Sequence, residues 1–324
     1  MGSLKLKKPQ IREFPFVTNI FESYQRSEKA LLSAIQQMVI DGVSTNKTKK
    51  ITKQLSSNLS FSKSTISRLM KELDPIVKKW RITNLDKHYE YIITDACYFY
   101  VRENSCVVKR PLLISVGVDT TGHRKTLEVD LAIDESEESY KEHIGSIKER
   151  GIKTTKLTIS DDHKGLVKVL EEEFSNTPHQ RCMVHFKRNL LSKVPYNERK
   201  LLSKYIKHIY NSPNKKMALK IANSISDKYR KSYLKVSELL DDHIEETLTF
   251  YQYPKTHHIK IRTTNLIEGN LNSLLKRRSK VVTIFPNKEN LIRYACCLLM
   301  EIDEEWQTGI IYMKMKKEDS YDID

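Results

Sequence analysis

The order of strand-like and helix-like segments after residue 88 is the feature that most constrains the fold. Three strand-like stretches come first, and short strands then alternate with amphipathic helices. The first three cover 89–101, 106–118 and 125–133, and "DTTGHRK" between the last two is a favourable turn sequence. Later strands are expected in "KLTIS" and "HQRCMVHF", each followed by a helix. This order predicts an α/β protein with a mixed five-stranded sheet and flanking helices.

The same order, β-β-β-α-β-α-β-α, matches that of the ribonuclease H-like fold, so we expect a ribonuclease H-like sheet. Two helical regions lie outside this pattern. Residues 1–86 are expected to form an N-terminal helical DNA-binding region, and residues 196–254 an all-α insertion. The catalytic core is then expected in two parts, 87–195 and 255–310, followed by a flexible tail at 311–324.

Two short helices in the N-terminal region resemble a helix-turn-helix. The second lies in "SFSKSTISRLMKELDP", where apolar residues follow Ile66 at helical spacing and Pro75 is expected to end the helix. Its other face is basic and rich in hydroxyl groups. We expect this face to contact DNA through Lys63, Ser64, Ser67 and Arg68. An ordinary helical hairpin is the alternative interpretation.

The charge balance indicates the kind of partner. The chain has 56 Lys and Arg residues against 41 acidic ones, a formal net charge of +15. This excess favours nucleic acid as a partner, with a solvated basic surface as the alternative. Five scattered cysteines form no disulfide framework and fit a reducing compartment. No stretch resembles a membrane span or a signal peptide, so we expect a soluble, cytoplasmic protein.

An acidic residue lies in the middle of the apolar run "YIITDACYFYV", residues 91–101. In a strand, Asp95 shares a face with Ile93, Cys97 and Phe99. Burying an unpaired carboxylate there would cost several kcal/mol. A cation, a metal ion or solvent at a sheet edge must therefore compensate its charge.

Two further acids have both a site interpretation and a structural one. In "KLTISDDHKGL", Asp161 continues the buried face of its strand at the carboxyl end, where ligand sites of open α/β sheets gather. Alternatively, either Asp161 or Asp162 could cap the helix that begins near His163. Glu268 in "TTNLIEGN" follows Asn265 by three residues, the spacing of a capping box.

Several segments, in order along the chain, resemble the Mutator-type transposases of bacterial and archaeal insertion sequences. They are "TDACYFYVR", "SVGVDTTGHRK", "TISDDHKGL", "HQRCMVHFKRNLLSKVP" and "RTTNLIEGN…VVTIFPN". The resemblance implies a DDE triad, with Asp95, Asp161 and Glu268 as catalytic and metal-binding acids. One departure is that asparagines stand two and four residues after Glu268, at 270 and 272, where the family has one three residues after it.

Three clustered carboxylates repel one another, and two divalent cations about 3.5–4 Å apart would offset this repulsion. Oxygen ligands select Mg²⁺ or Mn²⁺. The resemblance implies that Asp95 bridges both ions and that Asp161 and Glu268 each hold one. It further implies cleavage of a phosphodiester at the transposon end, followed by transfer of the freed 3′-hydroxyl into target DNA.

Other residues near these motifs are candidates for assisting or structural roles. Cys182 and His185 form half of a zinc site at most, and the family motif implies a structural role or one near DNA. His163 belongs to the Asp161 motif and either assists there or makes a local hydrogen bond. Basic residues expected to contact DNA phosphates are Arg181, Lys187, Arg188, Lys276, Arg277, Arg278 and Lys280.

The sequence therefore predicts a cytoplasmic, nucleoid-associated DNA transposase that acts as a homodimer or higher oligomer on transposon ends and target DNA. A catalytically idle, transposon-derived DNA-binding protein or repressor is the alternative, and the presence of all three acids argues against it. A ribonuclease H-type nuclease would have no evident use for the helical insertion and the N-terminal DNA-binding region.

Overall fold

The computed structural model describes residues 19–55, 61–85, 88–280 and 282–315. The chain divides into two compact units, residues 1–72 and 73–324. The first unit contains helices α1 (Asn19–Ile40), α2 (Thr45–Leu55) and α3 (Lys63–Lys71). Ile35 of α1 packs against Ile66 and Leu69 of α3 to form its core.

The ends of these helices follow from local chemistry. Gly42 adopts a positive φ of 83°, a backbone conformation that suits the end of α1. The Ser62 hydroxyl caps α3 by accepting a hydrogen bond from the Thr65 amide at 3.1 Å. The side chains expected to face DNA, Lys63, Ser64, Ser67 and Arg68, are all exposed. The helix-turn-helix stays a prediction, because residues 56–60 lie outside the described residues.

Pro75 does not end α3, as the sequence had suggested. Helix α3 ends at Lys71, and Pro75 instead lies in the first turn of a further helix, α4 (Asp74–Arg81), in the second unit. Proline suits this place because the N–H groups in the first turn of a helix have no partner within the helix, so the missing N–H of proline costs no hydrogen bond. Arg293 holds the start of α4 by donating to both carboxylate oxygens of Asp74.

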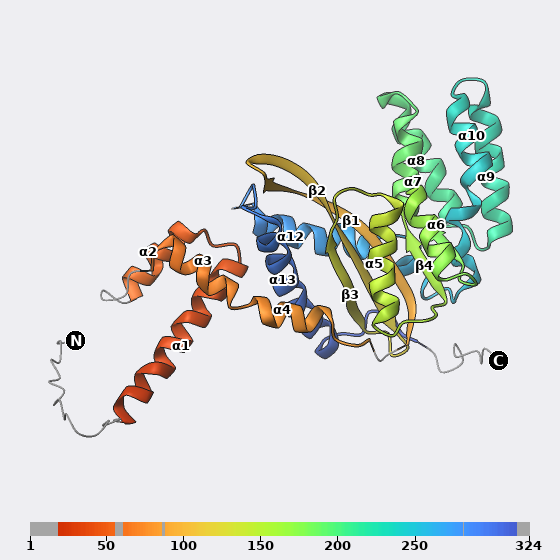
Figure 1. The fold of residues 1–324 in the computed structure, drawn as a ribbon. Coiled ribbons are helices and arrows are strands. Elements are labelled where there is room, and N and C mark those ends of the chain that lie inside the picture. The colour runs from red at the N-terminus through yellow and green to blue at the C-terminus, as the bar shows by residue number, and fades with distance from the viewer. Residues whose placement is uncertain (1–18, 56–60, 86–87, 281, 316–324) are drawn as a thin grey trace, which may run out of the picture. The chain divides into compact units, whose positions relative to one another are not determined.

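The second unit is built on the mixed five-stranded sheet that the sequence predicts, in the order β3-β2-β1-β4-β5 (Figure 1). Strands β1 and β2 pair antiparallel, as do β2 and β3, whereas β1, β4 and β5 run parallel. The order and directions are consistent with a ribonuclease H-like fold. The strands are β1 (Tyr89–Glu103), β2 (Cys106–Asp119), β3 (Arg124–Leu131), β4 (Leu157–Ser160) and β5 (His179–Arg181).

Helices flank this sheet. Helices α5 (Glu137–Glu149) and α6 (Lys164–Glu173) cover one face, where Ile92 and Leu113 pack with Tyr140 and Ile144. The alternation of β1 turns Phe99 to the opposite face. There Phe285 lies between Phe99 and Tyr294 of helix α13 (Lys288–Thr308).

Residues 196–254, expected to be all-α, contain helices and 3₁₀ turns and no strand. The helices are α8 (Tyr196–Tyr210), α9 (Lys215–Arg230) and α10 (Leu234–His243), and the 3₁₀ turns are Glu245–Thr247 and Thr249–Gln252. The interpretation of this region as an insertion stays a prediction. No helix within the described ranges combines the length and the apolar character needed to cross a bilayer.

The described part of the segment expected to be a loose tail is packed against the sheet. Met313 is buried, and the amides of Tyr312 and Met313 both donate to the carbonyl oxygen of Gly122, at 3.0 and 3.3 Å. Arg124 lies between the rings of Trp306 and Tyr312. Gly122, in the β2–β3 turn, therefore anchors residues 311–315.

Replacing Gly122 by Ala is expected to lower the free energy of unfolding by about 1–3 kcal/mol. Gly122 has a φ of +84°, and a Cβ there would overlap with the carbonyl oxygen of Met313. Gly145→Ala is the control, since a Cβ at this position in α5 meets nothing within 4 Å. Urea unfolding should show the control to be neutral or stabilised by up to about 1 kcal/mol. Equal behaviour of the two variants would contradict the anchoring role.

Candidate active site

Asp95 lies on the central strand β1 and is buried, with 6% of its surface exposed. Its Oδ1 accepts a hydrogen bond from the Ala96 amide at 2.8 Å. Its Oδ2 is also buried and has no hydrogen-bond partner among the described residues. Burial raises the pKa of Asp95 to about 7, against the opposing effect of His185. An orphaned carboxylate oxygen in this position is a place for a cation.

Asp161 follows β4 directly. The parallel register pairs Ile93 with Ile159, so Asp95 and Asp161 come two residues after neighbouring positions on adjacent strands. Asp161 Oδ1 accepts from the backbone amide of His163 at 3.2 Å, while Oδ2 lies 3.9 Å from Nδ1 of His185. Burial raises the pKa of Asp161. Asp161 does not cap α6, whose N-cap is His163 without a side-chain capping hydrogen bond, and its Oδ2 lies on the side of His185.

Glu268 lies in a π-helical turn, Leu266–Leu271, that leads into α12 (Asn272–Ser279). Such turns add a residue to a helix and recur at functional sites. No capping box forms, because the Asn265 side chain makes no capping hydrogen bond. Glu268 instead accepts from Arg188 through Oε1 and lies 3.2 Å from Nε2 of His185 through Oε2. Burial opposes ionisation of Glu268, but Arg188 and His185 hold its pKa below the usual value.

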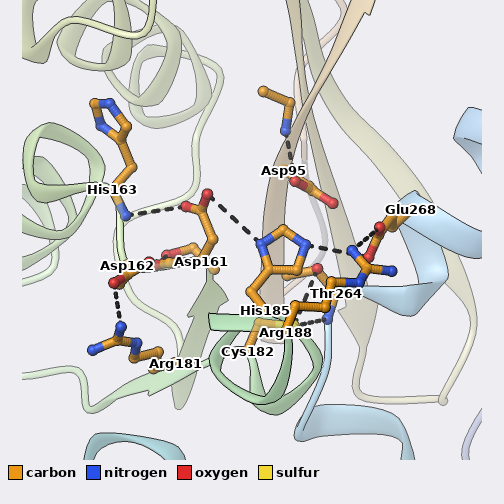
Figure 2. Close-up of polar contacts among 12 residues, drawn as sticks. Asp95, Asp161, Asp162, His163, Arg181, Cys182, His185, Arg188, Thr264 and Glu268 are labelled. Atoms are coloured by element: carbon orange, nitrogen blue, oxygen red, sulfur yellow. Dashed lines mark hydrogen bonds and ion pairs between the residues drawn. The ribbon is translucent and has the colours of Figure 1, made fainter. Parts of the chain in front are cut away.

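Helix α7 (Met183–Ser192) carries the two basic side chains that join these acids. The imidazole of His185 lies between Asp161 and Glu268, and the Asp95 carboxylate is directed toward the same space (Figure 2). The three acids predicted from the sequence are therefore brought together around one histidine. Arg188, one turn further along α7, completes the pairing of Glu268.

Cys182 and His185 contact different partners in the structure. The buried Cys182 Sγ accepts from the backbone amide and the hydroxyl of Thr264, both at 3.4 Å. Cys182 therefore fixes the segment that precedes the π-helical turn. Burial raises the pKa of the Cys182 thiol.

His163 points its ring away from the three acids (Figure 2). The ring lies 5.4 Å from that of Tyr140, measured between centroids, and only the His163 backbone contacts Asp161. This geometry supports a structural role for the side chain.

The donor set fits a divalent cation in its chemistry, although the carboxylates are not yet gathered as ligands. Within the described ranges, no three His, Cys, Asp or Glu side chains are arranged to hold an ion as they stand. The orphaned Oδ2 of Asp95 fits a metal ligand, and oxygen donors suit Mg²⁺ or Mn²⁺. His185 contacts Asp161 and Glu268, and the guanidinium of Arg188 places a positive charge beside Glu268.

Arg181 differs from the other basic residues predicted to contact DNA. Its side chain is only 4% exposed, and its terminal nitrogens pair with Asp162 and Glu246. Its guanidinium also lies 5.1 Å from the ring of Phe186. Arg181 thus links β5 to the helical region and is not presented to a phosphate.

We expect Arg181→Ala to lower the free energy of unfolding by about 2–3 kcal/mol, less than for a fully buried pair because both acidic partners are half exposed. Urea unfolding measures this loss. Lys187→Ala, a change at a partly exposed neighbour, should cost under about 0.5 kcal/mol. A stable Arg181→Ala protein with weakened DNA binding would instead support the phosphate contact predicted from the sequence.

The remaining basic candidates are more accessible. Arg188, Lys276 and Lys280 are exposed and Lys187 is partly exposed. The side chains of Arg277 and Arg278 lie outside the described residues.

Glu135 is an acid near the site that the sequence did not single out. It accepts from the hydroxyls of Tyr98 and Tyr140, and its charge contributes to the raised pKa of Asp161. Glu135 stands in the acidic run "DESEE", where nothing in the sequence marks one acid over another.

A Ser-His-Asp arrangement elsewhere in the sheet is structural. Ser115 Oγ lies 2.9 Å from His143 Nε2, and His143 Nδ1 lies 2.7 Å from Asp130. Ser115 has no exposed surface and also hydrogen-bonds Thr94 at 2.8 Å. A nucleophile must reach its substrate, so this arrangement does not define a hydrolase.

Fold and site together define an α/β protein with an acidic site beside the middle of β1 and the carboxyl end of β4. The chain belongs to the Mutator family of transposases, whose family model matches residues 1–309. It is 37% identical over 315 residues to the transposase for insertion sequence element ISRM5 of Rhizobium meliloti, covering 97% of this chain and 79% of the relative. It is 36% identical over 309 residues to the transposase for IS256 in transposon Tn4001 of Staphylococcus aureus, covering 94% and 78%.

Proposed function

We propose that this protein is a DDE transposase that cleaves DNA at transposon ends and joins the freed 3′-hydroxyl to target DNA. The observation that carries the proposal is the buried Oδ2 of Asp95, which lacks a partner beside two further acids. Family membership and the net charge of +15 support DNA as the substrate.

Two Mg²⁺ or Mn²⁺ ions held by Asp95, Asp161 and Glu268 would activate the attacking hydroxyl and stabilise the leaving oxygen. For this, Glu268 must exchange its contacts with His185 and Arg188. Arg188 has 59% of its side chain exposed and would then be free to contact a DNA phosphate. The exposed face of α3 would bind the transposon end through Lys63, Ser64, Ser67 and Arg68.

Joining two transposon ends requires at least two active sites, so we propose a homodimer or higher oligomer. The reaction takes place where chromosomal DNA is, which places the protein in the cytoplasm with the nucleoid. The first reaction hydrolyses a phosphodiester and the second exchanges one phosphodiester for another. Neither reaction requires a nucleotide cofactor.

A catalytically idle DNA-binding protein is the second candidate. The specific observation in its favour is that His185 and Arg188 already satisfy Glu268. A cleavage assay separates the two candidates, with labelled DNA taken from both borders of the element and Mg²⁺ or Mn²⁺ added. Cleavage at the borders that EDTA abolishes supports the transposase, whereas specific binding without cleavage supports the idle protein.

A further inference from the structure

Strands β1 and β2 continue beyond the rest of the sheet as a two-stranded ribbon, residues 98–103 and 106–110 (Figure 1). Strand β4 pairs with β1 only at 91–93, and strand β3 pairs with β2 only from Leu112 onward. Within the described ranges, the ribbon's one further strand-like contact is a bridge between Val101 and Phe285.

The two faces of this ribbon differ in kind. The inner face is apolar, with Phe99 and Val101 buried. The outer face carries two exposed tyrosines, Tyr98 at 40% and Tyr100 at 53%. Its other members are Arg102, Val107 and Lys109, all exposed. Lys109 stands directly across from Tyr100 and places Nζ 4.2 Å from the ring centroid of Tyr98.

The outer face is also positively charged. The one acid of the ribbon, Glu103, is neutralised by Arg110 at 2.6 Å and by Lys288 at 3.7 Å. In the part of the chain that the structure describes, neither Arg102 nor Lys109 pairs with a carboxylate. Exposed aromatic rings interleaved with unpaired cations are the features that bind unpaired nucleic-acid bases.

The outer face comes near Asp161 through Glu135, whereas Asp95 lies on the opposite face of β1. The Tyr98 hydroxyl donates to Glu135, which also accepts from Tyr140 at 2.9 Å. Burial, Glu135 and the charge of Asp161 raise the pKa of Tyr98 to about 12, so Asp161 lies within electrostatic reach. A DNA strand lying on the outer face would therefore pass Glu135 and lead toward Asp161.

We propose that the outer face of the ribbon binds unpaired bases of the DNA strand next to the cleavage site, with Tyr98 and Tyr100 stacking on bases and Arg102 and Lys109 contacting phosphates. The two tyrosines stand about 7 Å apart along the strand, which suits successive bases of an extended single strand. This inference rests on the proposed function. It assigns to the ribbon a preference for unpaired over paired DNA.

The test measures binding of full-length protein to two fluorescent probes in EDTA, so that cleavage does not interfere. One probe is a short blunt duplex, and the other is the same duplex with a single-stranded oligo-dT tail. Tyr100→Ala should weaken binding of the tailed duplex on the order of tenfold and leave the blunt duplex within about twofold. Tyr100→Phe keeps the ring and should bind both probes as the wild type does.

Tyr196→Ala is the matched control, since Tyr196 is 86% exposed on α8, outside the ribbon. Equal effects of Tyr100→Ala on both probes, or no effect, would overturn the proposal. A change in the oligomeric state of Tyr100→Ala in size-exclusion chromatography would also overturn the proposal. It would show that the ribbon binds a second copy of the chain. Border cleavage by the wild type is assayed separately, so loss of one proposal leaves the other testable.

Discussion

Replacing Asp95 by Asn should slow DNA cleavage on the order of 10³-fold or more while leaving DNA binding intact. The reason is that an amide would be a poorer ligand than a carboxylate for the divalent ions proposed above, and metal-ion catalysis contributes several kcal/mol at about 1.4 kcal/mol per factor of ten. The unpaired Oδ2 of Asp95 makes no hydrogen bond that the substitution would break. Gel assays of border cleavage and anisotropy of end binding measure the two effects.

The folded state should tolerate this change. A neutral amide is less costly to bury than a carboxylate, so the free energy of unfolding of Asp95→Asn in EDTA should equal or exceed that of the wild type. Asp134→Asn is the control, because Asp134 is an exposed loop acid that accepts a hydrogen bond from the backbone of Ser136. This variant should cleave DNA at the wild-type rate. An Asp95→Asn protein that cleaves at the wild-type rate would refute the assignment of the three acids.

Replacing Asp303 by Asn should raise the free energy of unfolding at pH 8 by on the order of 2–4 kcal/mol. Asp303 is buried in α13, where its Oδ1 accepts from the Thr126 amide at 2.8 Å and its Oδ2 has no partner among the described residues. Burial raises its pKa from 3.8 to about 7. Asparagine keeps an oxygen for the Thr126 amide and removes the charge.

The sign of the pH dependence follows from this raised pKa. Between pH 4 and 7 the native protein holds a proton on Asp303 that the unfolded chain releases, so the contribution of this residue to stability decreases as the pH rises. The difference in free energy of unfolding between variant and wild type should therefore grow from pH 4 to 7 and then level off. Urea unfolding across this range measures it.

Asp227→Asn is the control for this effect, since its carboxylate is 77% exposed on α9. Its stability difference from the wild type should stay within about 0.5 kcal/mol at each pH. A pH-independent difference for Asp303→Asn would contradict the raised pKa.

The sheet could be predicted because its signals are local. Alternating apolar residues and the turn at Gly122 determine β1 to β3 with errors of only a few residues. The acid in an apolar strand marks Asp95 as a site residue, because few other arrangements tolerate a buried carboxylate. Asp95 and Asp161 each come two residues after the paired residues Ile93 and Ile159, and this parallel pairing places Asp161 beside Asp95.

The remaining features depend on contacts between distant segments, which spacing does not encode. Nothing near Arg181 in sequence reveals that Glu246, 65 residues away, will bury it as an ion pair. Arg188 was expected to contact DNA, yet in the folded chain it pairs with Glu268. The role of Pro75 was misjudged because proline is compatible with the beginning of a helix as well as its end.

The π-helical turn at Leu266–Leu271 has a consequence for how such a chain tolerates changes in length. Loss of one residue there would restore ordinary α-helical spacing, yet it would rotate α12 by about 100° relative to Glu268. Lys276, on α12, would then point in a new direction although every charged group survives. Single-codon deletions in this turn are thus a route by which a mobile element falls silent while its acidic triad stays intact.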